Sequence, residues 1–399
     1  MLAHYLQYLN QINVSLDKKL KFIEGHLKVH SESLALRSKS NEILSYNIAN
    51  AGTPNFKAKD LDFTEMLNNK MGFGEVKTSN QRHFKMTFGP NEQGVKFRQN
   101  VINRSKEIID LGISEAGKTR PDAEAELDRA VQALTHIAGV QHFYPSHYSQ
   151  NVAGGIDIAD LRFPIGVVVG VGPFNFPILI PLLHSAMALV TGNTYIGKPS
   201  EKVPSVSRLY ADIWKESGLP DGCYNVVNGD KETVEFLVRH EKVDGLAFIG
   251  STAAAKSLKM LGVEHNTKVQ ALGGAKNHMI VLPDADLDMS ADAAVSASFG
   301  AAGQRCMAVS VVVAVGDIAD ELIDKIKERM PNLVMGVTDD DKTQLGPVIS
   351  PENKDRIYSF IDSAEPDGAT LVVDGRIRSN SLEGCFVGPT LIDNVKPGM

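Results

Sequence analysis

The chain contains little cysteine, no excess of positive charge and no uninterrupted apolar run. Only 3 of its 399 residues are cysteine, which excludes a disulfide framework, favours a reducing compartment and leaves room for one reactive thiol. The net charge of -7 gives no electrostatic reason to expect nucleic acid as a partner. With 43% hydrophobic and 22% charged residues, the composition predicts a cytoplasmic globular protein of two or three domains, and we expect no metal site.

Neither a secretion signal nor a membrane span is expected. The first residues lack a basic region followed by an apolar one, as a Sec signal requires. The most apolar stretch, residues 163–190, is long enough to raise the question of a span, but glycines, prolines, Asn175 and His184 interrupt it. A strand, a turn and a buried helix explain this stretch better.

The composition changes near residues 85–97, and the part before this change is polar. Residues 31–50 have the periodicity of a helix with one apolar face, and Pro54 ends it. A helix that buries one face needs a partner. This region is therefore either a flexible leader or an assembly segment.

Beyond Phe97 the pattern predicts two helices up to Gly139 and then an alternation of strands with helices. The expected strands and helices, in chain order, are 165–171, 182–190, 194–198, 205–217, 224–227, 231–240, 243–249 and 253–261. This alternation is typical of a doubly wound parallel sheet in an α/β domain. A less regular continuation, with strands at 279–282 and 309–315 and helices at 290–301 and 318–330, predicts a second α/β lobe. We expect domains at 1–90, 91–272 and 273–399.

Cys306 is the cysteine with the most suggestive neighbours. A thiol attacks as the thiolate, which a nearby positive charge favours, and Arg305 precedes it directly. Gly303 allows a close backbone approach. A lone cysteine is more often structural than catalytic, so this signal is weak by itself. Cys223 and Cys385 have no such neighbours and are interpreted as ordinary packing or surface residues.

Three further segments can be interpreted either as parts of a catalytic or cofactor site or as ordinary structural turns. Asn175, framed by Pro173 and Pro177, could project an amide N–H toward a developing oxyanion, or could cap a plain turn. Residues 198–201 end a strand and could bind ribose hydroxyls, or form a solvated turn. Residues 248–252 join a strand to a helix and could present N–H groups to a pyrophosphate, although the G-x-G-x-x-G fingerprint is absent.

The order of these segments from about residue 94 to residue 399 resembles the aldehyde dehydrogenase superfamily. The matching segments are 173–177, 192–194, 198–201, 250–252, 272–274 and 303–306. The resemblance implies that Cys306 is the nucleophile, Asn175 the oxyanion donor and NAD the cofactor. The residues it assigns to NAD are Phe174, Lys198, Ser200, Glu201, Gly250 and Ser251. A carboxylate at Glu201 would repel the 2′-phosphate of NADP.

One departure from the superfamily pattern indicates a branch. Ala271 stands where most members carry the glutamate that activates water, and alanine cannot act as a base. Together with Arg305–Ala308 and Asn151–Asp157, it resembles the CoA-acylating methylmalonate-semialdehyde dehydrogenases. That resemblance implies oxidation of methylmalonate or malonate semialdehyde, loss of CO2 and transfer of the acyl group to CoA. Arg305 is a candidate for the substrate carboxylate, and equally for tuning the thiolate or packing.

The first part of the chain, about residues 12–85, resembles something else. The segment Asn47–Phe63 carries the Asn-Ile-Ala-Asn-Ala-x-Thr-Pro pattern of flagellar basal-body rod proteins. This implies rod partners for residues 31–63, a flagellar location and a fusion. The alternative function is therefore a rod subunit with an inactive dehydrogenase-derived tail. The terminal strand that joins dehydrogenase subunits into homo-oligomers has no match before Met399.

Overall fold

The computed structural model describes residues 92–140 and 147–399, with side chains from residue 96 onward. From Gln93 onward the chain forms one compact unit. The predicted helix at 31–50 and the rod-like segment lie outside the described residues, and the expected domain boundaries remain predictions.

Three helices open the described part, where the sequence predicted two. They are α3 (Glu92–Asn103), α4 (Ser105–Ala116) and α5 (Arg120–Ala138). The first predicted helix was wrong because Arg104 leaves helical geometry (φ -101°, ψ 18°) and divides it into α3 and α4. Helix α4 ends at Gly117, whose left-handed φ of 64° suits glycine. Thr119 then caps α5 by accepting a hydrogen bond from the Asp122 N–H.

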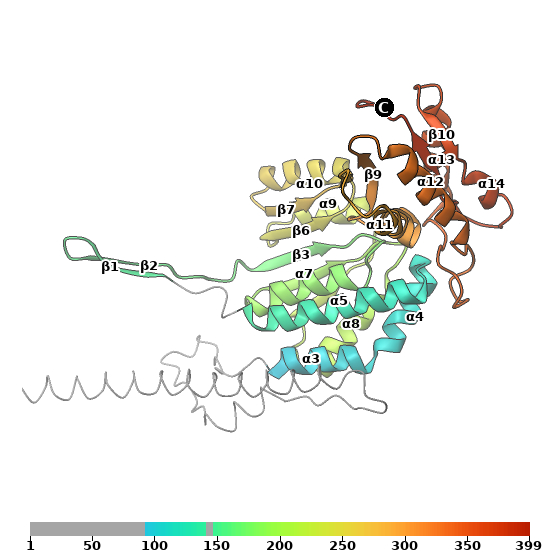
Figure 1. The fold of residues 1–399 in the computed structure, drawn as a ribbon. Coiled ribbons are helices and arrows are strands. Elements are labelled where there is room, and N and C mark those ends of the chain that lie inside the picture. Colours follow the sequence, from blue (N-terminus) through green and yellow to red (C-terminus); the bar gives the residue numbers. More distant parts are fainter. Residues whose placement is uncertain (1–91, 141–146) are drawn as a thin grey trace, which may run out of the picture. The chain divides into compact units, whose positions relative to one another are not determined.

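The predicted doubly wound sheet is confirmed. Five parallel strands lie in the order β5-β4-β3-β6-β7. In chain order they are β3 (Val167–Val171), β4 (Thr194–Lys198), β5 (Tyr224–Val226), β6 (Gly245–Ile249) and β7 (Lys268–Leu272), and β7 was not predicted. The helices that alternate with them are α7 (Leu179–Val190), α8 (Ser205–Glu216), α9 (Lys231–Arg239) and α10 (Thr252–Glu264) (Figure 1). Val168 packs with the cluster of α7 and α8, and Val169 with that of α9 and α10, so both faces of the sheet are covered.

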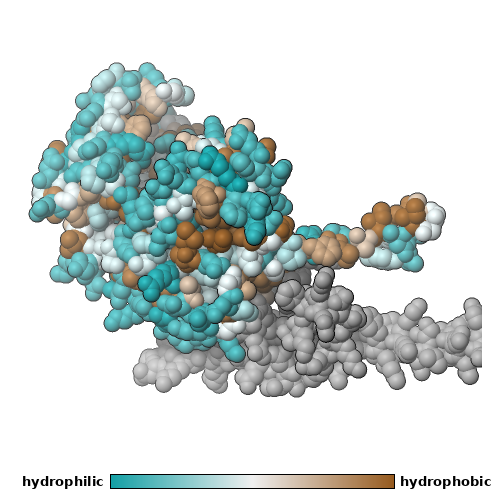
Figure 2. All heavy atoms as spheres, turned by 180° about the vertical axis from the view of Figure 1, so that it is seen from behind, coloured by the Kyte–Doolittle hydropathy of each residue, from teal (hydrophilic) through white to brown (hydrophobic). Residues whose placement is uncertain are grey.

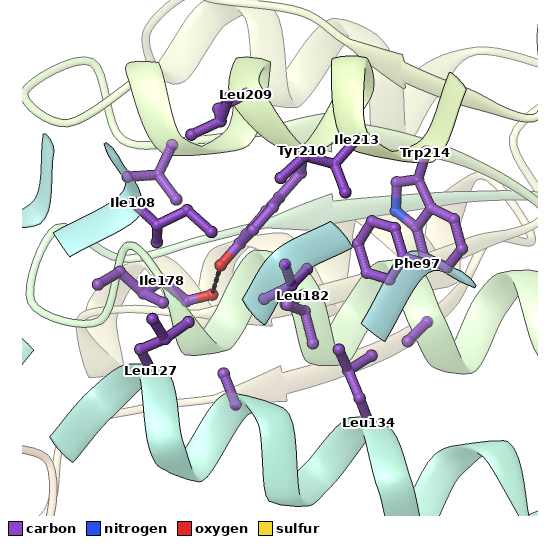
Figure 3. Packing of buried hydrophobic residues seen from close by; sticks show 14 of the residues in the cluster. Phe97, Ile108, Leu127, Leu134, Ile178, Leu182, Leu209, Tyr210, Ile213 and Trp214 are labelled. Carbon is purple, nitrogen blue, oxygen red and sulfur yellow. Dashed lines mark hydrogen bonds between the residues drawn. The ribbon is translucent and has the colours of Figure 1, made fainter. Parts of the chain in front are cut away.

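The largest apolar cluster joins α3, α4, α5, α7 and α8 (Figure 3). Phe97 stacks on Trp214 with ring centroids 3.4 Å apart, and both rings are buried. Beside them the hydroxyl of Tyr210 donates a 2.8 Å hydrogen bond to the carbonyl of Ile178, at the start of α7. Burying a large apolar side chain stabilises a fold by roughly 1.5–3 kcal/mol. This cluster therefore stabilises the position of α7. The candidate site lies in the loop directly before α7.

The predicted second α/β lobe is also confirmed. Parallel strands β8 (Asn277–Val281) and β9 (Val309–Ala314) pack with α11 (Leu287–Phe299) and α12 (Ala319–Arg329). Two short 3-10 turns, η1 (Gly300–Gly303) and η2 (Met330–Asn332), follow these helices. The later elements were not predicted: α13 (Pro351–Ala364), α14 (Arg376–Ser379) and the antiparallel pair β10 (Thr370–Val373) and β11 (Leu391–Asp393).

A second unpredicted feature is an antiparallel hairpin of β1 (Tyr148–Ala153) and β2 (Ile156–Ala159). Every residue of both strands is exposed, and Figure 2 shows apolar side chains gathered on this hairpin. Asn151, at an irregularity within β1, and Gly155, in the turn, have left-handed φ values of 52° and 77°. No helix within the described ranges is long and apolar enough to cross a membrane.

Candidate active site

The predicted cofactor segments lie at one edge of the five-stranded sheet. Strands β3, β4 and β6 are parallel neighbours, so their carboxyl ends share this edge. From β3 the chain order runs outward to β4 and β5 on one side and to β6 and β7 on the other. Doubly wound proteins bind ligands at such a switch point. The loops after β3, β4 and β6 carry Asn175, Glu201 and Ser251.

The structure brings Asn175 next to the loop of Cys306. The Asn175 Nδ2 atom donates a 2.9 Å hydrogen bond to the backbone carbonyl of Gln304, two positions before the cysteine. The two residues are 129 positions apart in the sequence. An amide nitrogen has two hydrogens, so this bond orients the group and leaves a second N–H for another acceptor. Asn175 is therefore bonded to the loop that carries Cys306, and the roles predicted for the two residues remain proposals.

Two amide side chains that the sequence analysis did not select hold the nucleophile loop. The Gln304 side chain donates to the carbonyls of Ala301 and Pro347 and accepts from the Ile349 N–H at 2.9 Å. From the opposite side, Asn277 Nδ2 donates at 2.9 Å to the carbonyls of Cys306 and Ala308. The Cys306 residue itself is exposed. Gln304 stands within the segment 303–306 quoted for the resemblance, Asn277 lies three positions after the segment 272–274, and only the structure shows what the two amides bind.

The backbone leading to Cys306 is strained. Ala301 and Ala302 both have φ of 53°, and Gly303 follows with φ of 71°. The left-handed region costs an ordinary residue roughly 1–2 kcal/mol. Strain of this kind persists where surrounding contacts impose it, and it gathers at functional sites. The hydrogen bonds of Gln304 and Asn277 are such contacts.

Arg305 reaches away from the thiol loop to helix α5. Its guanidinium forms an ion pair with Asp122, and the two side chains are 34% and 15% exposed. A Cβ atom at Gly300 would lie 2.5 Å from this guanidinium, so a larger residue there would displace the Arg305 side chain from its present position. Both charged groups line a cavity of about 800 Å³ between α5, α11 and the loop at residues 341–344. Arg305, which was predicted from the sequence as a ligand for the substrate carboxylate, is therefore already paired with a carboxylate of the protein. This role of Asp122 was not predicted from the sequence.

The lysine and glutamate predicted to bind ribose contact each other. Lys198 is almost fully buried at the end of β4, and its Nζ lies 3.3 Å from Glu201 Oε2. The Glu201 side chain is 59% exposed. A hydrogen bond from its own backbone N–H, helped by Lys198, holds the pKa of the Glu201 carboxyl below its usual value. The Ser200 hydroxyl accepts a hydrogen bond from the Lys202 N–H and so shapes this turn.

The turn after β6 suits the approach of a phosphate. Ser251 caps α10 by accepting a 3.3 Å hydrogen bond from the Ala254 N–H, which leaves other N–H groups of the first turn without intrahelical acceptors. A Cβ atom at Gly250 would lie 2.5 Å from the Phe248 ring, so only glycine fits. Phe174, the remaining candidate, is half-buried in the loop after β3. These features fit a dinucleotide, and the roles of these residues remain proposals.

Ala271 lies in β7 opposite Phe248 of β6 and packs against the apolar cluster of α9 and α10. Its methyl group can neither accept nor donate a proton. Among the residues that the structure describes, no three histidine, cysteine or acidic side chains gather in a way that could hold a metal ion.

A doubly wound sheet, a second α/β lobe and a cysteine held beside an amide donor together make up the architecture of an aldehyde dehydrogenase. The family model described as "Aldehyde dehydrogenase family" matches residues 95–399, and the chain belongs to this family. The match of the family model begins at residue 95 and so does not include residues 12–85, whose predicted resemblance to rod proteins is unsupported.

The similar proteins include named semialdehyde dehydrogenases. Malonate-semialdehyde dehydrogenase 2 of Geobacillus thermodenitrificans is 41% identical over 76% of this chain and 63% of its own length. The human mitochondrial methylmalonate-semialdehyde/malonate-semialdehyde dehydrogenase [acylating] is 40% identical over 76% of this chain and 57% of its own length. A solved structure from Sinorhizobium meliloti 1021, complexed with NAD, is 40% identical with a TM-score of 0.74, covering 77% of this chain and 63% of that one. The chain thus spans less than two thirds of these relatives.

Proposed function

We propose that the chain catalyses the NAD-dependent, CoA-acylating oxidation of malonate or methylmalonate semialdehyde. The observation that carries the proposal is the hydrogen bond from Asn175 to Gln304, because it joins the donor loop to the nucleophile loop. The names of the relatives, which include malonate-semialdehyde and acylating enzymes, support the substrate class.

In the proposed mechanism, the Cys306 thiolate attacks the aldehyde carbon and forms a hemithioacetal. The free N–H of Asn175 and the backbone N–H of Cys306 stabilise the resulting oxyanion. NAD, when bound, supplies the hydride acceptor that turns this adduct into a thioester on Cys306. Lys198 and Glu201 would hold the adenosine ribose, Gly250 and Ser251 would face the pyrophosphate, and Phe174 and Ser200 would also contribute to the cofactor site.

The malonyl-type thioester then loses its carboxylate as CO2, and the enolate that remains takes up a proton from solvent to give the propionyl or acetyl thioester. The CoA thiolate attacks the remaining acyl carbon, the bond to the Cys306 sulfur breaks, and propionyl-CoA or acetyl-CoA leaves. Ala271 supports this route, since no carboxylate at that position activates water against the thioester. Arg305 is proposed to receive the substrate carboxylate, in exchange for its present partner Asp122.

The test is NADH formation by the purified chain with malonate semialdehyde, with and without CoA. Continuous turnover that needs CoA and yields acetyl-CoA supports the proposal. Acid formed at the same rate without CoA would indicate a hydrolytic aldehyde dehydrogenase instead. No NADH from a folded chain would refute the activity for this polypeptide.

The homo-oligomer implied by the resemblance has a candidate surface in the β1–β2 hairpin. Val152, Ile156 and Ile158 are 48%, 54% and 56% exposed there. Exposed apolar patches of this kind mark contact surfaces. Ile156→Asp with Ile158→Asp should lower the mass measured by sedimentation if the hairpin joins copies. The rod-subunit alternative rests on the sequence of residues 31–63 alone.

A further inference from the structure

A buried ion pair lies behind the loop that carries Asn175. Lys118 Nζ is 2.8 Å from Glu126 Oε2, and the two side chains are only 6% and 1% exposed. A buried pair of this kind is an inefficient way to stabilise a fold, because two charges lose their hydration. The contacts of Lys118 and of Glu126 indicate that the pair positions the segment after Asn175.

Glu126 caps a helix that it does not belong to. Its Oε1 atom accepts hydrogen bonds from the N–H groups of Ile178 and Leu179, both at 2.8 Å. These groups open helix α7, which has no side-chain cap of its own. A carboxylate is favoured at a helix N-terminus because it satisfies free N–H groups and faces the positive end of the helix dipole. Burial raises the pKa of Glu126, while Lys118 and the two N–H groups favour its charged form.

Lys118 holds the residue next to Asn175. Its Nζ atom lies 4.6 Å from the centre of the Phe176 ring, within cation–π range. The hydroxyl of Tyr210 fixes the carbonyl of Ile178 from the other side (Figure 3). The chain from Phe176 to Leu179 is thus held at three points, directly after Asn175.

We propose that Lys118 and Glu126 are positioning residues that set the amide of Asn175 against the oxyanion formed at Cys306. Before substrate binds, helix α5 contacts both loops of the site, because Asp122, one turn before Glu126, pairs with Arg305 of the Cys306 loop. A displacement of about 1 Å in such a group can lower a rate a hundredfold. The inference rests on the proposed role of Asn175 as oxyanion donor.

The test uses two reagents that need neither NAD nor CoA. With p-nitrophenyl acetate, the Cys306 thiolate attacks the carbonyl carbon, a thioester forms, and p-nitrophenolate leaves through an oxyanion intermediate. With iodoacetamide, the thiolate displaces iodide, and no oxyanion arises. Mass spectrometry of the Cys306 peptide follows both reactions. Loss of the positioned amide should slow only the first.

The variants are Glu126→Gln and a neutral pair, Glu126→Leu with Lys118→Met, which leaves no buried charge unpaired. We expect acylation of Cys306 to slow at least tenfold in both, with alkylation within twofold of the parent. In an Asn175→Ala background the same changes should slow acylation no further. Glu115→Gln is the matched control, because Glu115 binds the Ser205 N–H at the start of α8 and should leave acylation unchanged.

Equal slowing of both reactions, additive slowing in the Asn175→Ala background, or unchanged acylation would overturn the inference. Unchanged acylation in Asn175→Ala alone would overturn it too, because Asn175 would then not be the oxyanion donor. A chain that acylates Cys306 as expected yet forms no NADH would refute the proposed function and leave the inference standing. Circular dichroism confirms that each variant is folded.

Discussion

Asn175 donates its side-chain hydrogen bond to the carbonyl of Gln304, so the donor loop after β3 is fixed against the loop of Cys306. The bond joins the sheet domain to the second lobe. Because the bond links the two loops, the position of the Asn175 amide relative to the Cys306 loop depends on how both loops are held.

Arg305→Gln separates the two roles considered for this arginine. If the guanidinium binds the substrate carboxylate, kcat/KM for malonate semialdehyde should fall about thirtyfold more than kcat/KM for propanal, which lacks a carboxylate. Loss of a charged hydrogen-bonding partner of about 2 kcal/mol gives this ratio. Equal losses for both aldehydes would instead assign Arg305 to docking on Asp122.

Ala271→Glu should increase acid formation in the absence of CoA by tenfold or more, since general-base catalysis contributes at least that much. The new side chain must leave the apolar cluster against which Ala271 packs, so the free energy of unfolding should fall by about 1–2 kcal/mol. Ala271→Gln is the control of equal size without a base. Similar acid formation in both variants would mean that the base lies elsewhere.

Glu201→Gln should relax the preference for NAD. The carboxylate is charged at neutral pH, as a glutamate is at its ordinary pKa, and its lowered pKa extends the charged form to more acid conditions. A negative charge there repels a 2′-phosphate. The side chain is 59% exposed, so we expect a gain of about 1 kcal/mol, or roughly fivefold, in NADP use relative to NAD. Steady-state kinetics with both cofactors measure it, and Glu264→Gln on the exposed end of α10 should change nothing.

His184 of α7 should make stability sensitive to acid. Its Nδ1 atom is buried without a hydrogen-bond partner among the described residues, and desolvation lowers its pKa from 6.5 to about 4. The unfolded chain therefore binds a proton first, and stability present above pH 6.5 is lost as the pH falls toward 4, by up to about 1.4 kcal/mol per pH unit.

Urea unfolding between pH 7 and 4 tests this expectation. His184→Gln should flatten the pH dependence, whereas His265→Gln at an exposed position should not. The same slope in all three proteins would show that other groups govern the acid response.

The sequence predicted those parts of the fold whose pattern is local. Strands such as Val167–Val171 can be predicted from their continuous apolar runs, because both faces of a parallel sheet are buried. The break at Arg104 has no glycine or proline to mark it. The β1–β2 hairpin was missed since its apolar side chains face solvent instead of alternating between core and surface.

The same limit applies to the site. Cys306, Asn175 and the turn at Gly250 stand in recognisable motifs, and the structure bonds Asn175 to Gln304, two positions before Cys306. Glu126, Asp122 and Asn277 act through backbone groups or charges 29 to 183 positions away. Such partners are joined by folding alone, so no spacing in the sequence could indicate them.

The most direct test of the account is a rapid-mixing measurement of NADH with malonate semialdehyde in the absence of CoA, followed by the mass of the Cys306 peptide. We predict a burst of about one NADH per chain, an acetyl group on Cys306, and continuous turnover once CoA is added, with none of this in Cys306→Ala. Sustained turnover without CoA, or a burst that leaves Cys306 unmodified, would contradict a CoA-acylating mechanism through this cysteine.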